Sequence, residues 1–103
     1  MNTGLQQALL FQALGHPERL RILEILAHGS ICVCDLVRLT GKRQPYISQH
    51  LSVLSAAQLV VSERDGRRIF YRLEPDTLDD VLQALRQLCQ SKSSSQKRSN
   101  SYV

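Results

Sequence analysis

The chain has 103 residues, 43% of them hydrophobic and few of them aromatic, which suits one domain with a single core of limited size. No apolar run approaches the ~20 residues of a membrane span and no export signal is recognisable, so we expect a cytoplasmic protein with reduced cysteines. The net charge of +4 divides into −1 for residues 1–37, +5 for 38–72, −3 for 73–90 and +3 for 91–103. The positive central segment favours a polyanion-binding face over an evenly solvated surface.

The first third of the chain predicts three helices. Residues 5–14 form an apolar helix with hardly any charge, which a small domain can bury against a second copy of itself. A second helix is predicted at residues 17–27, where a proline at the first position precedes a wide apolar stripe. The third helix is expected at residues 32–39, with Ser30 as its cap and Asp35 in its first turn or just beyond.

Residues 40–59 predict a turn followed by a short helix with one apolar and one polar side. Gly41 supplies the permissive backbone that ends the preceding helix, and Ile47, Leu51 and Leu54 form an apolar seam. The other side suits base edges and phosphates, so we expect the recognition helix of a helix-turn-helix. The predicted DNA-contacting residues of this stretch are Lys42, Arg43, Gln44, Tyr46, Ser48, Gln49 and His50. His50 lies at the edge of the seam, and the alternative is that it positions the helix.

The hydrophobic period then changes from helical to alternating. Residues 59–64 and 67–73 predict two strands, joined at Asp65-Gly66 by a hairpin turn. Three arginines gather at the tip of this hairpin, where we expect them to contact flanking phosphates or the minor groove: Arg64, Arg67 and Arg68.

The last helix is predicted at residues 77–90, and its apolar stripe is expected to be a dimer face. The stripe consists of Leu78, Val81, Leu82, Leu85 and Leu88. Residues 1–90 are therefore expected to form one DNA-binding and dimerisation domain. Residues 91–103 are Ser-rich and basic, and we expect a disordered tail. Together the elements predict a mainly α fold with a small β-hairpin (α+β), a winged helix-turn-helix.

Four sequence segments carry a resemblance that covers residues 9–90. They read GHPERLRILEIL, ICVCDLV, QPYISQHLSVL and DGRRIFYRL, in this order. In them the chain resembles the winged-helix repressors of the ArsR/SmtB family. The resemblance implies a homodimer, joined through its first and last helices, that binds double-stranded operator DNA. It also implies release from DNA when an inducer, usually a metal or metalloid ion, binds.

The CVCDL segment is similar to that of the arsenic- and antimony-responsive branch of this family. This similarity implies that the thiolates of Cys32 and Cys34 bind As(III) or Sb(III) as inducer. Val37 stands where that branch usually has a third cysteine, and Cys89 is an uncertain third ligand. The chain has no cysteine near its N-terminus and no histidine in its last helix, which argues against the cadmium/lead and zinc sites of other relatives.

Several alternatives remain open at the level of sequence. Two thiols at a helix start also suit a thiol-redox-responsive repressor of the same fold. Another alternative is a repressor whose inducer is Cd(II) or a different soft metal. Both cysteines could instead be small buried hydrophobic residues, and the winged helix could bind proteins only. No catalytic constellation is recognisable, so we do not expect an enzyme.

A helix that begins at Cys32 constrains how Cys34 can share an ion with it. Residues two apart in an ideal helix point about 200° away from each other. We therefore expect the start of the third helix to unwind by about one turn when both thiolates bind an inducer. The inducer and DNA would then favour different conformations and oppose each other.

Overall fold

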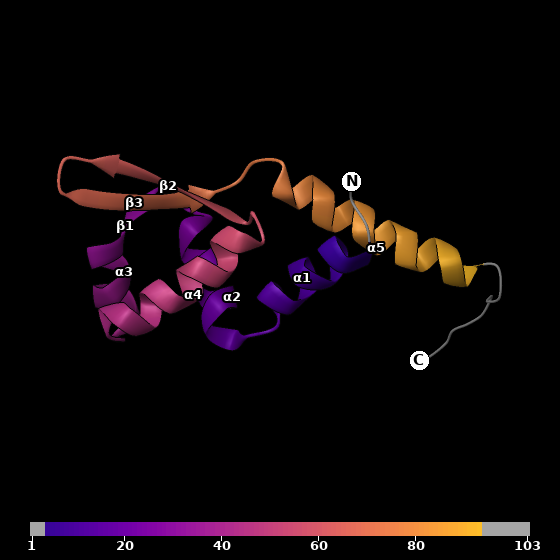
Figure 1. The fold of residues 1–103 in the computed structure, drawn as a ribbon, viewed down its shortest axis with the longest axis horizontal. Coiled ribbons are helices and arrows are strands. Elements are labelled where there is room, and N and C mark those ends of the chain that lie inside the picture. The colour runs from indigo at the N-terminus through magenta and orange to yellow at the C-terminus, as the bar shows by residue number, and fades with distance from the viewer. Residues whose placement is uncertain (1–3, 94–103) are drawn as a thin grey trace.

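The computed structural model describes residues 4–93, which contain the helices and strands shown in Figure 1. In chain order they are α1 (Gly4–Leu14), α2 (Pro17–Leu26), β1 (Ile31–Cys32), α3 (Val33–Thr40), α4 (Gln44–Ala56), β2 (Val60–Asp65), β3 (Arg68–Leu73) and α5 (Thr77–Ser93). This order confirms the predicted mainly α fold with a winged helix-turn-helix. Within residues 4–93, no helix combines the length and apolar character that crossing a membrane requires.

The turn between α3 and α4 is closed by its own hydrogen bonds. Gly41 ends α3 with a left-handed φ of 71°, as predicted, a conformation that strains any residue with a β-carbon. The Thr40 hydroxyl donates to the carbonyl oxygen of Leu36 at 2.7 Å and accepts from the backbone N–H of Lys42 at 3.3 Å. These contacts fix the direction in which α4 leaves the turn.

The core lies where α2, α3 and α4 meet the sheet. Ile22, Leu36, Ile47 and Leu54 are 0% exposed, and Leu51 is 1% exposed. Burial of one such side chain stabilises the fold by about 1.5–3 kcal/mol. Three of the five belong to α4, which confirms the predicted apolar seam and leaves the opposite side of α4 facing outward.

The sheet has three strands in the order β1-β3-β2, whereas the sequence predicted a two-stranded hairpin. The hairpin itself is confirmed, with its turn at Gly66. The additional strand, β1, pairs antiparallel with β3 and places Ile31 opposite Tyr71 and Cys32 opposite Phe70. A two-residue strand is too short to show a period of two, so no pattern in the sequence predicted it.

The presence of β1 corrects the predicted start of the third helix. Cys32 has extended backbone angles and is the N-cap residue of α3, which begins at Val33. Ser30 is therefore not the N-cap residue, and the Cys32 side chain makes no capping hydrogen bond to α3. Asp35 lies in the first turn of α3, as predicted. Because Cys32 is outside the helix, the helical angle between it and Cys34 does not apply.

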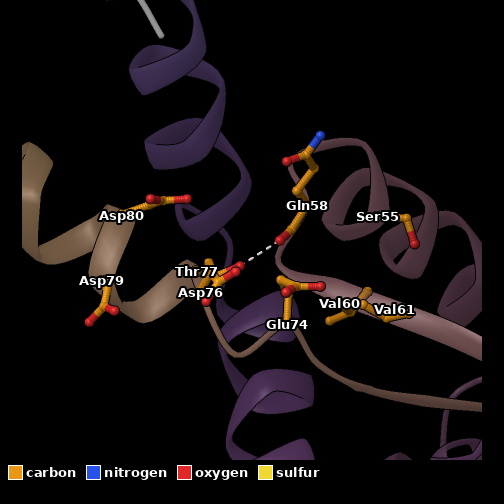
Figure 2. A pocket seen from close by; sticks show the side chains of 9 residues that line it. All are labelled: Ser55, Gln58, Val60, Val61, Glu74, Asp76, Thr77, Asp79 and Asp80. Carbon is orange, nitrogen blue, oxygen red and sulfur yellow. Dashed lines mark hydrogen bonds between the residues drawn. The ribbon is translucent and has the colours of Figure 1, made fainter. Parts of the chain in front are cut away.

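α5 is attached to the winged helix at its first residue. The Thr77 hydroxyl donates to the carbonyl oxygen of Gln58 at 2.5 Å (Figure 2). The helix then runs alongside α1, where Gln7 Nε2 donates to Gln87 Oε1 at 2.5 Å (Figure 1). This arrangement brings the first and last helices together.

The paired helices expose several large apolar side chains, among them Leu5, Leu9, Leu82 and Leu85. Of the predicted stripe on the last helix, Leu82 and Leu85 are 40% and 44% exposed, whereas Val81 packs against the core. The helix continues to Ser93, so the first three residues of the predicted tail are helical. The rest of that tail, residues 94–103, lies outside the described residues.

Candidate functional site

The outer side of α4 carries most of the residues that the sequence singled out. Gln44, Tyr46, Ser48 and Gln49 are exposed, and so are Lys42 and Arg43 in the preceding turn. The ammonium group of Lys42 lies 5.9 Å from the centre of the Tyr46 ring, a cation–π distance. This surface presents positive charge, amides and hydroxyls, and it lacks a carboxylate among these residues.

His50 lies beneath that surface and is only 7% exposed. Its Nδ1 is 3.2 Å from Nη1 of Arg19 on α2, and its ring packs against those of His16 and Tyr46. Burial lowers the pKa of His50 below its ordinary value of 6.5, and the positive charges of His16 and Arg19 lower it further. These contacts match the alternative in which His50 positions α4.

Arg19 is a residue that sequence reasoning did not single out. Its Nε donates to the carbonyl oxygen of Ala13 at 2.7 Å, and its Nη2 donates to that of Gln12 at 3.1 Å. Both acceptors belong to the last turn of α1, where helix carbonyls lack partners within the helix. Backbone carbonyls leave no residue-type signal, so only the helix break at Gly15-His16 indicated that α1 ends here.

The three arginines of the wing lie at the hairpin tip, as predicted. Arg64, Arg67 and Arg68 are all exposed, and β2 and β3 pair as far as Asp65 opposite Arg68. Within residues 4–93, ion pairs join Arg38 to Asp35 and Arg72 to Glu63, and none involves these three arginines.

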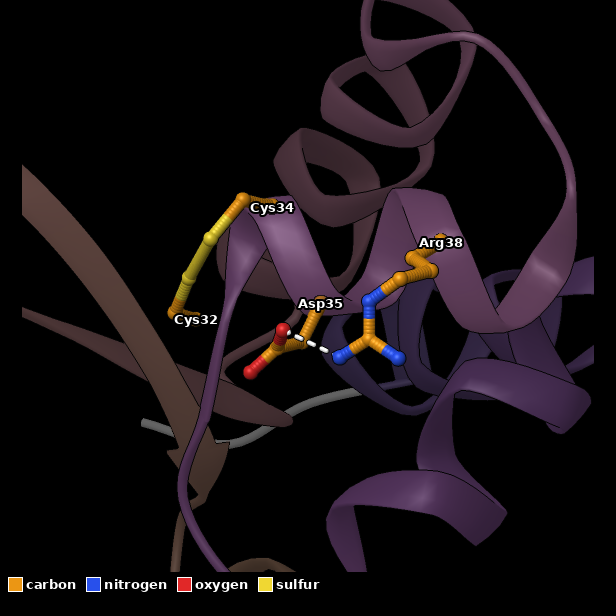
Figure 3. Close-up of a disulfide and its surroundings, with 4 residues drawn as sticks. All are labelled: Cys32, Cys34, Asp35 and Arg38. Atoms are coloured by element: carbon orange, nitrogen blue, oxygen red, sulfur yellow. Dashed lines mark hydrogen bonds and ion pairs between the residues drawn. A yellow bond between two sulfur atoms is a disulfide. The ribbon is translucent and has the colours of Figure 1, made fainter.

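The two cysteines of the CVC segment lie together at the junction of β1 and α3. Their Cα atoms are 5.4 Å apart, and their sulfur atoms form a disulfide (Figure 3). Cys32 is 2% exposed and Cys34 is exposed, so the pair has one protected and one accessible sulfur. The two sulfurs therefore meet without unwinding of α3, which corrects the conformational change expected from the sequence.

The cysteine pair opens into a crevice of about 230 Å³ between α4 and the wing. Its lining residues are Cys32, Val33, Cys34, Gln44, Ser48, Arg67, Arg68, Ile69 and Tyr71. We call this the thiol crevice. It joins the predicted inducer ligands to residues of both predicted DNA-contacting elements.

Among the described residues, Cys32, Cys34 and Asp35 form the one group whose ligand atoms, all within 4.8 Å of one another, could hold a metal ion. The Asp35 carboxylate already accepts from Arg38 at 2.6 Å (Figure 3). Cys89 is exposed on the second half of α5, which extends away from β1 and α3 in Figure 1. The structure therefore brings two of the three predicted thiol ligands together and separates the third within the chain.

A second, larger cavity of about 580 Å³ lies between the end of α4 and the start of α5 (Figure 2). Its acidic lining residues are Glu74, Asp76, Asp79 and Asp80. Within residues 4–93 these carboxylates do not converge into a group able to hold a metal ion.

Comparison with known proteins places this geometry among transcriptional regulators. A profile described as "Bacterial regulatory protein, arsR family" matches residues 16–62. An uncharacterised HTH-type transcriptional regulator of Methanocaldococcus jannaschii is 38% identical over 82 residues, which are 79% of this chain and 92% of that regulator. The arsenical resistance operon repressor of Staphylococcus aureus is 36% identical over 76 residues, which are 74% of this chain and 73% of the repressor.

A similar solved structure is a homodimeric winged helix-turn-helix DNA-binding domain from Mycobacterium bovis, described as a possible ArsR-family transcriptional regulator. It superposes with a TM-score of 0.67 and 31% sequence identity, and the match covers 92% of this chain and 88% of that domain. The likeness therefore extends over most of the chain.

Proposed function

The chain belongs to the arsR family of bacterial regulatory proteins, and we propose that it is a homodimeric repressor that leaves operator DNA when As(III) or Sb(III) binds Cys32 and Cys34. The observation that carries this proposal is the thiol crevice, because the paired sulfurs and the predicted DNA-contacting residues line the same space. An ion bound there lies within reach of both DNA-contacting elements.

The DNA side of the proposal rests on the exposed polar side of α4 and on the wing. Side chains such as Gln49 and Ser48 can donate to and accept from base edges in a major groove. The wing arginines, which form no ion pair with any residue from 4 to 93, suit flanking phosphates, which set affinity without reading sequence. In a two-fold symmetric dimer the two α4 helices would enter major grooves about 34–36 Å apart.

The dimer side rests on α1 and α5, which expose Leu5, Leu9, Leu82 and Leu85. A second copy would remove these apolar side chains from water. The homodimeric domain from Mycobacterium bovis, which is similar over 92% of this chain, supports the same assembly here.

The inducer side rests on the chemistry of the donor set. Thiolates select soft ions, and two sulfurs at bonding distance from each other need only reduction to become a chelating pair. The first turn of α3 supplies backbone N–H groups and partial positive charge, which favour thiolates beside it. The S. aureus relative, whose name is arsenical resistance operon repressor, supports As(III) as the inducer.

Binding of inducer and of DNA are then opposed through one coupling free energy, typically about 1–3 kcal/mol. The same factor that weakens DNA binding in the presence of As(III) must weaken As(III) binding in the presence of operator. Because the two sulfurs already meet, the coupling is carried by the thiol crevice and needs no unwound turn.

A second candidate is a thiol-redox-responsive repressor, which the Cys32–Cys34 disulfide itself favours. Peroxide would oxidise the exposed Cys34 thiolate to a sulfenic acid and release hydroxide. The Cys32 thiolate would then attack that sulfur, form the disulfide and release a second hydroxide. In this reading the disulfide is the induced state, and reduction restores DNA binding.

The experiment is a DNA-release titration of the reduced protein, followed by fluorescence anisotropy of labelled operator. Arsenite, antimonite, Cd(II), Zn(II) and peroxide are compared on the wild type and on Cys32→Ser, Cys34→Ser and Cys89→Ser. Release by arsenite and antimonite at the lowest concentrations, lost in the first two variants, supports the metalloid repressor. Release by peroxide alone favours the redox repressor, and wild-type arsenite release by both CxC variants refutes the assignment of these ligands.

A further inference from the structure

The thiol crevice offers two sulfur donors to an ion that forms three bonds. As(III) in arsenous acid has three oxygen substituents, and each thiolate replaces one of them. Within residues 4–93, the third group near the sulfurs is the Asp35 carboxylate, a hard oxygen donor already bonded to Arg38. Cys89 lies on the distant half of α5 of the same chain. Within one chain, the ion's third bond is therefore left without a thiolate ligand.

The rest of the crevice has a definite chemical character. The wing contributes Arg67 and Arg68, which form no ion pair within residues 4–93, and α4 contributes the Gln44 amide and the Ser48 hydroxyl. Its volume of about 230 Å³ exceeds the ~30 Å³ share of one water several times over, so it can admit a small organic molecule. Guanidinium groups are the preferred protein partners of carboxylates.

Resting on the proposed function, we propose that the third sulfur comes from a small carboxylate-bearing thiol, whose carboxylate binds Arg67 and Arg68 while its sulfur binds the metalloid. Arsenous acid, the two cysteine thiols and one molecule of the small thiol give the trithiolate and three molecules of water. Arsenic remains As(III) throughout, so the step needs no oxidant or reductant. The inducer is then a complex of metalloid and anionic thiol.

This arrangement explains release from DNA by direct competition. A carboxylate held between α4 and the wing occupies the two arginines that would otherwise contact phosphate, and it places negative charge beside the DNA backbone. The metalloid fixes the anion covalently, so high salt does not displace it as it would a free ion. No change in α3 is required.

The test compares three small thiols that differ in charge: 3-mercaptopropionate, 2-mercaptoethanol and cysteamine. The full-length protein is reduced with a phosphine, desalted and bound to labelled operator, and arsenite is titrated at one fixed concentration of each thiol. We expect 3-mercaptopropionate to lower the arsenite midpoint about tenfold relative to cysteamine, because hydrogen bonds between charged groups are worth more than one factor of ten. Native mass spectrometry without DNA should detect one arsenic and one 3-mercaptopropionate per chain.

Matched variants separate the crevice from general effects of charge. Arg67→Gln/Arg68→Gln should abolish the preference for the anionic thiol, with DNA concentrations adjusted to equal initial occupancy. Arg64→Gln changes the same wing tip but does not line the crevice, so it should retain the preference. Competition by free thiols for arsenite in solution is identical for all three proteins and cannot produce this difference.

Equal midpoints with the three thiols, arsenic bound without thiol in the mass spectrum, or loss of the preference in Arg64→Gln would each overturn the inference. Arsenite release under those outcomes would leave the proposed function intact. Absence of arsenite release with every thiol would refute the proposed function itself, and the inference with it.

Discussion

The guanidinium of Arg19 lies 3.2 Å from Nδ1 of His50 and so joins α2 to the middle of α4. Arg only donates hydrogen bonds and keeps its charge, so Nδ1 of His50 must be the acceptor and the ring must be neutral with its proton on Nε2. The same guanidinium binds the last-turn carbonyls of α1. One side chain therefore links a helix of the proposed dimer face to the helix proposed to read DNA.

Acidification should weaken both the fold and DNA binding through His50. Burial first, then the positive charges of His16 and Arg19, hold the pKa of His50 below 6.5, although Glu18 opposes this. The folded chain therefore binds fewer protons at this site than the unfolded chain, and stability present above pH 6.5 is lost as the pH falls below it. Protonated Nδ1 would also face Arg19 as a second donor. Operator affinity and urea midpoints measured from pH 7.5 to 5 should fall together.

The groups that face His50 are His16, the N-cap residue before α2, Glu18 and Arg19 on α2, and Tyr46 on its own helix. His50→Gln keeps an amide acceptor for Arg19 and cannot be protonated, so its affinity should change less with pH. His28→Gln alters an exposed histidine and should follow the wild-type profile. A His50→Gln profile that matched the wild type would remove His50 as the source of the effect.

Removal of the Arg19 guanidinium should destabilise the fold by about 1–3 kcal/mol, because two carbonyls and a buried ring nitrogen lose their donor. The free energy of unfolding of Arg19→Ala in urea measures this. Arg21→Ala is the matched control on the same helix, since its exposed guanidinium donates one bond, at 3.3 Å to Leu39. We expect that control to stay within about 0.5 kcal/mol of the wild type. Equal losses in both variants would show that Arg19 has no special role.

Removal of the two crevice arginines should weaken DNA binding alike on all sequences. Each neutralised phosphate adds roughly one unit to the dependence of log K on log salt concentration, so Arg67→Gln/Arg68→Gln should reduce that slope by about two units. Arg38→Gln removes a guanidinium that already pairs with Asp35, and it should leave the slope unchanged. A wild-type slope in the double variant would mean that the wing does not contact phosphate.

A charge on the exposed apolar face of α5 should dissociate the proposed dimer. Leu85→Glu places a carboxylate among side chains that the proposed partner would cover, so sedimentation equilibrium should report a monomer. Operator affinity should fall as well, because a single half-site offers too little contact. Leu39→Glu is the control, since Leu39 is 48% exposed on α3 and outside this face. A dimeric Leu85→Glu protein would place the interface elsewhere.

The residue pattern was sufficient to predict a helix or strand where that element is long and its sequence signals are local. The seam of Ile47, Leu51 and Leu54 repeats over more than one helical turn, and Gly41 marks the end of α3 by its own backbone freedom. These features predicted the helix-turn-helix and the outward side of α4. The wing followed in the same way from alternation around an Asp-Gly turn.

Pattern failed where structure depends on contacts between distant segments. Cys32 becomes part of a strand only because Phe70 lies opposite it, thirty-eight residues later in the chain. The angle of about 200° between residues two apart holds only within a helix, and Cys32 precedes α3, so this angle does not describe Cys32 and Cys34. The Arg19 junction likewise depends on where α1 ends in space. Periodicity carries no information about such pairings.

The pairing of Cys32 with Phe70 also attaches the wing to the residue that precedes α3. From Phe70 the chain runs outward through Arg68, the first residue of β3, to Arg67 in the turn, about 10 Å at roughly 3.3 Å per residue. If the wing tilts as a rigid unit, it turns about Cys32, which is the buried cysteine proposed to bind the inducer. A tilt of about 20° around Cys32 moves Arg67 at the hairpin tip by about 3.5 Å, which is more than the length of a hydrogen bond. The hairpin could then lose its contacts with DNA while the hydrogen bonds between β2 and β3 stay intact.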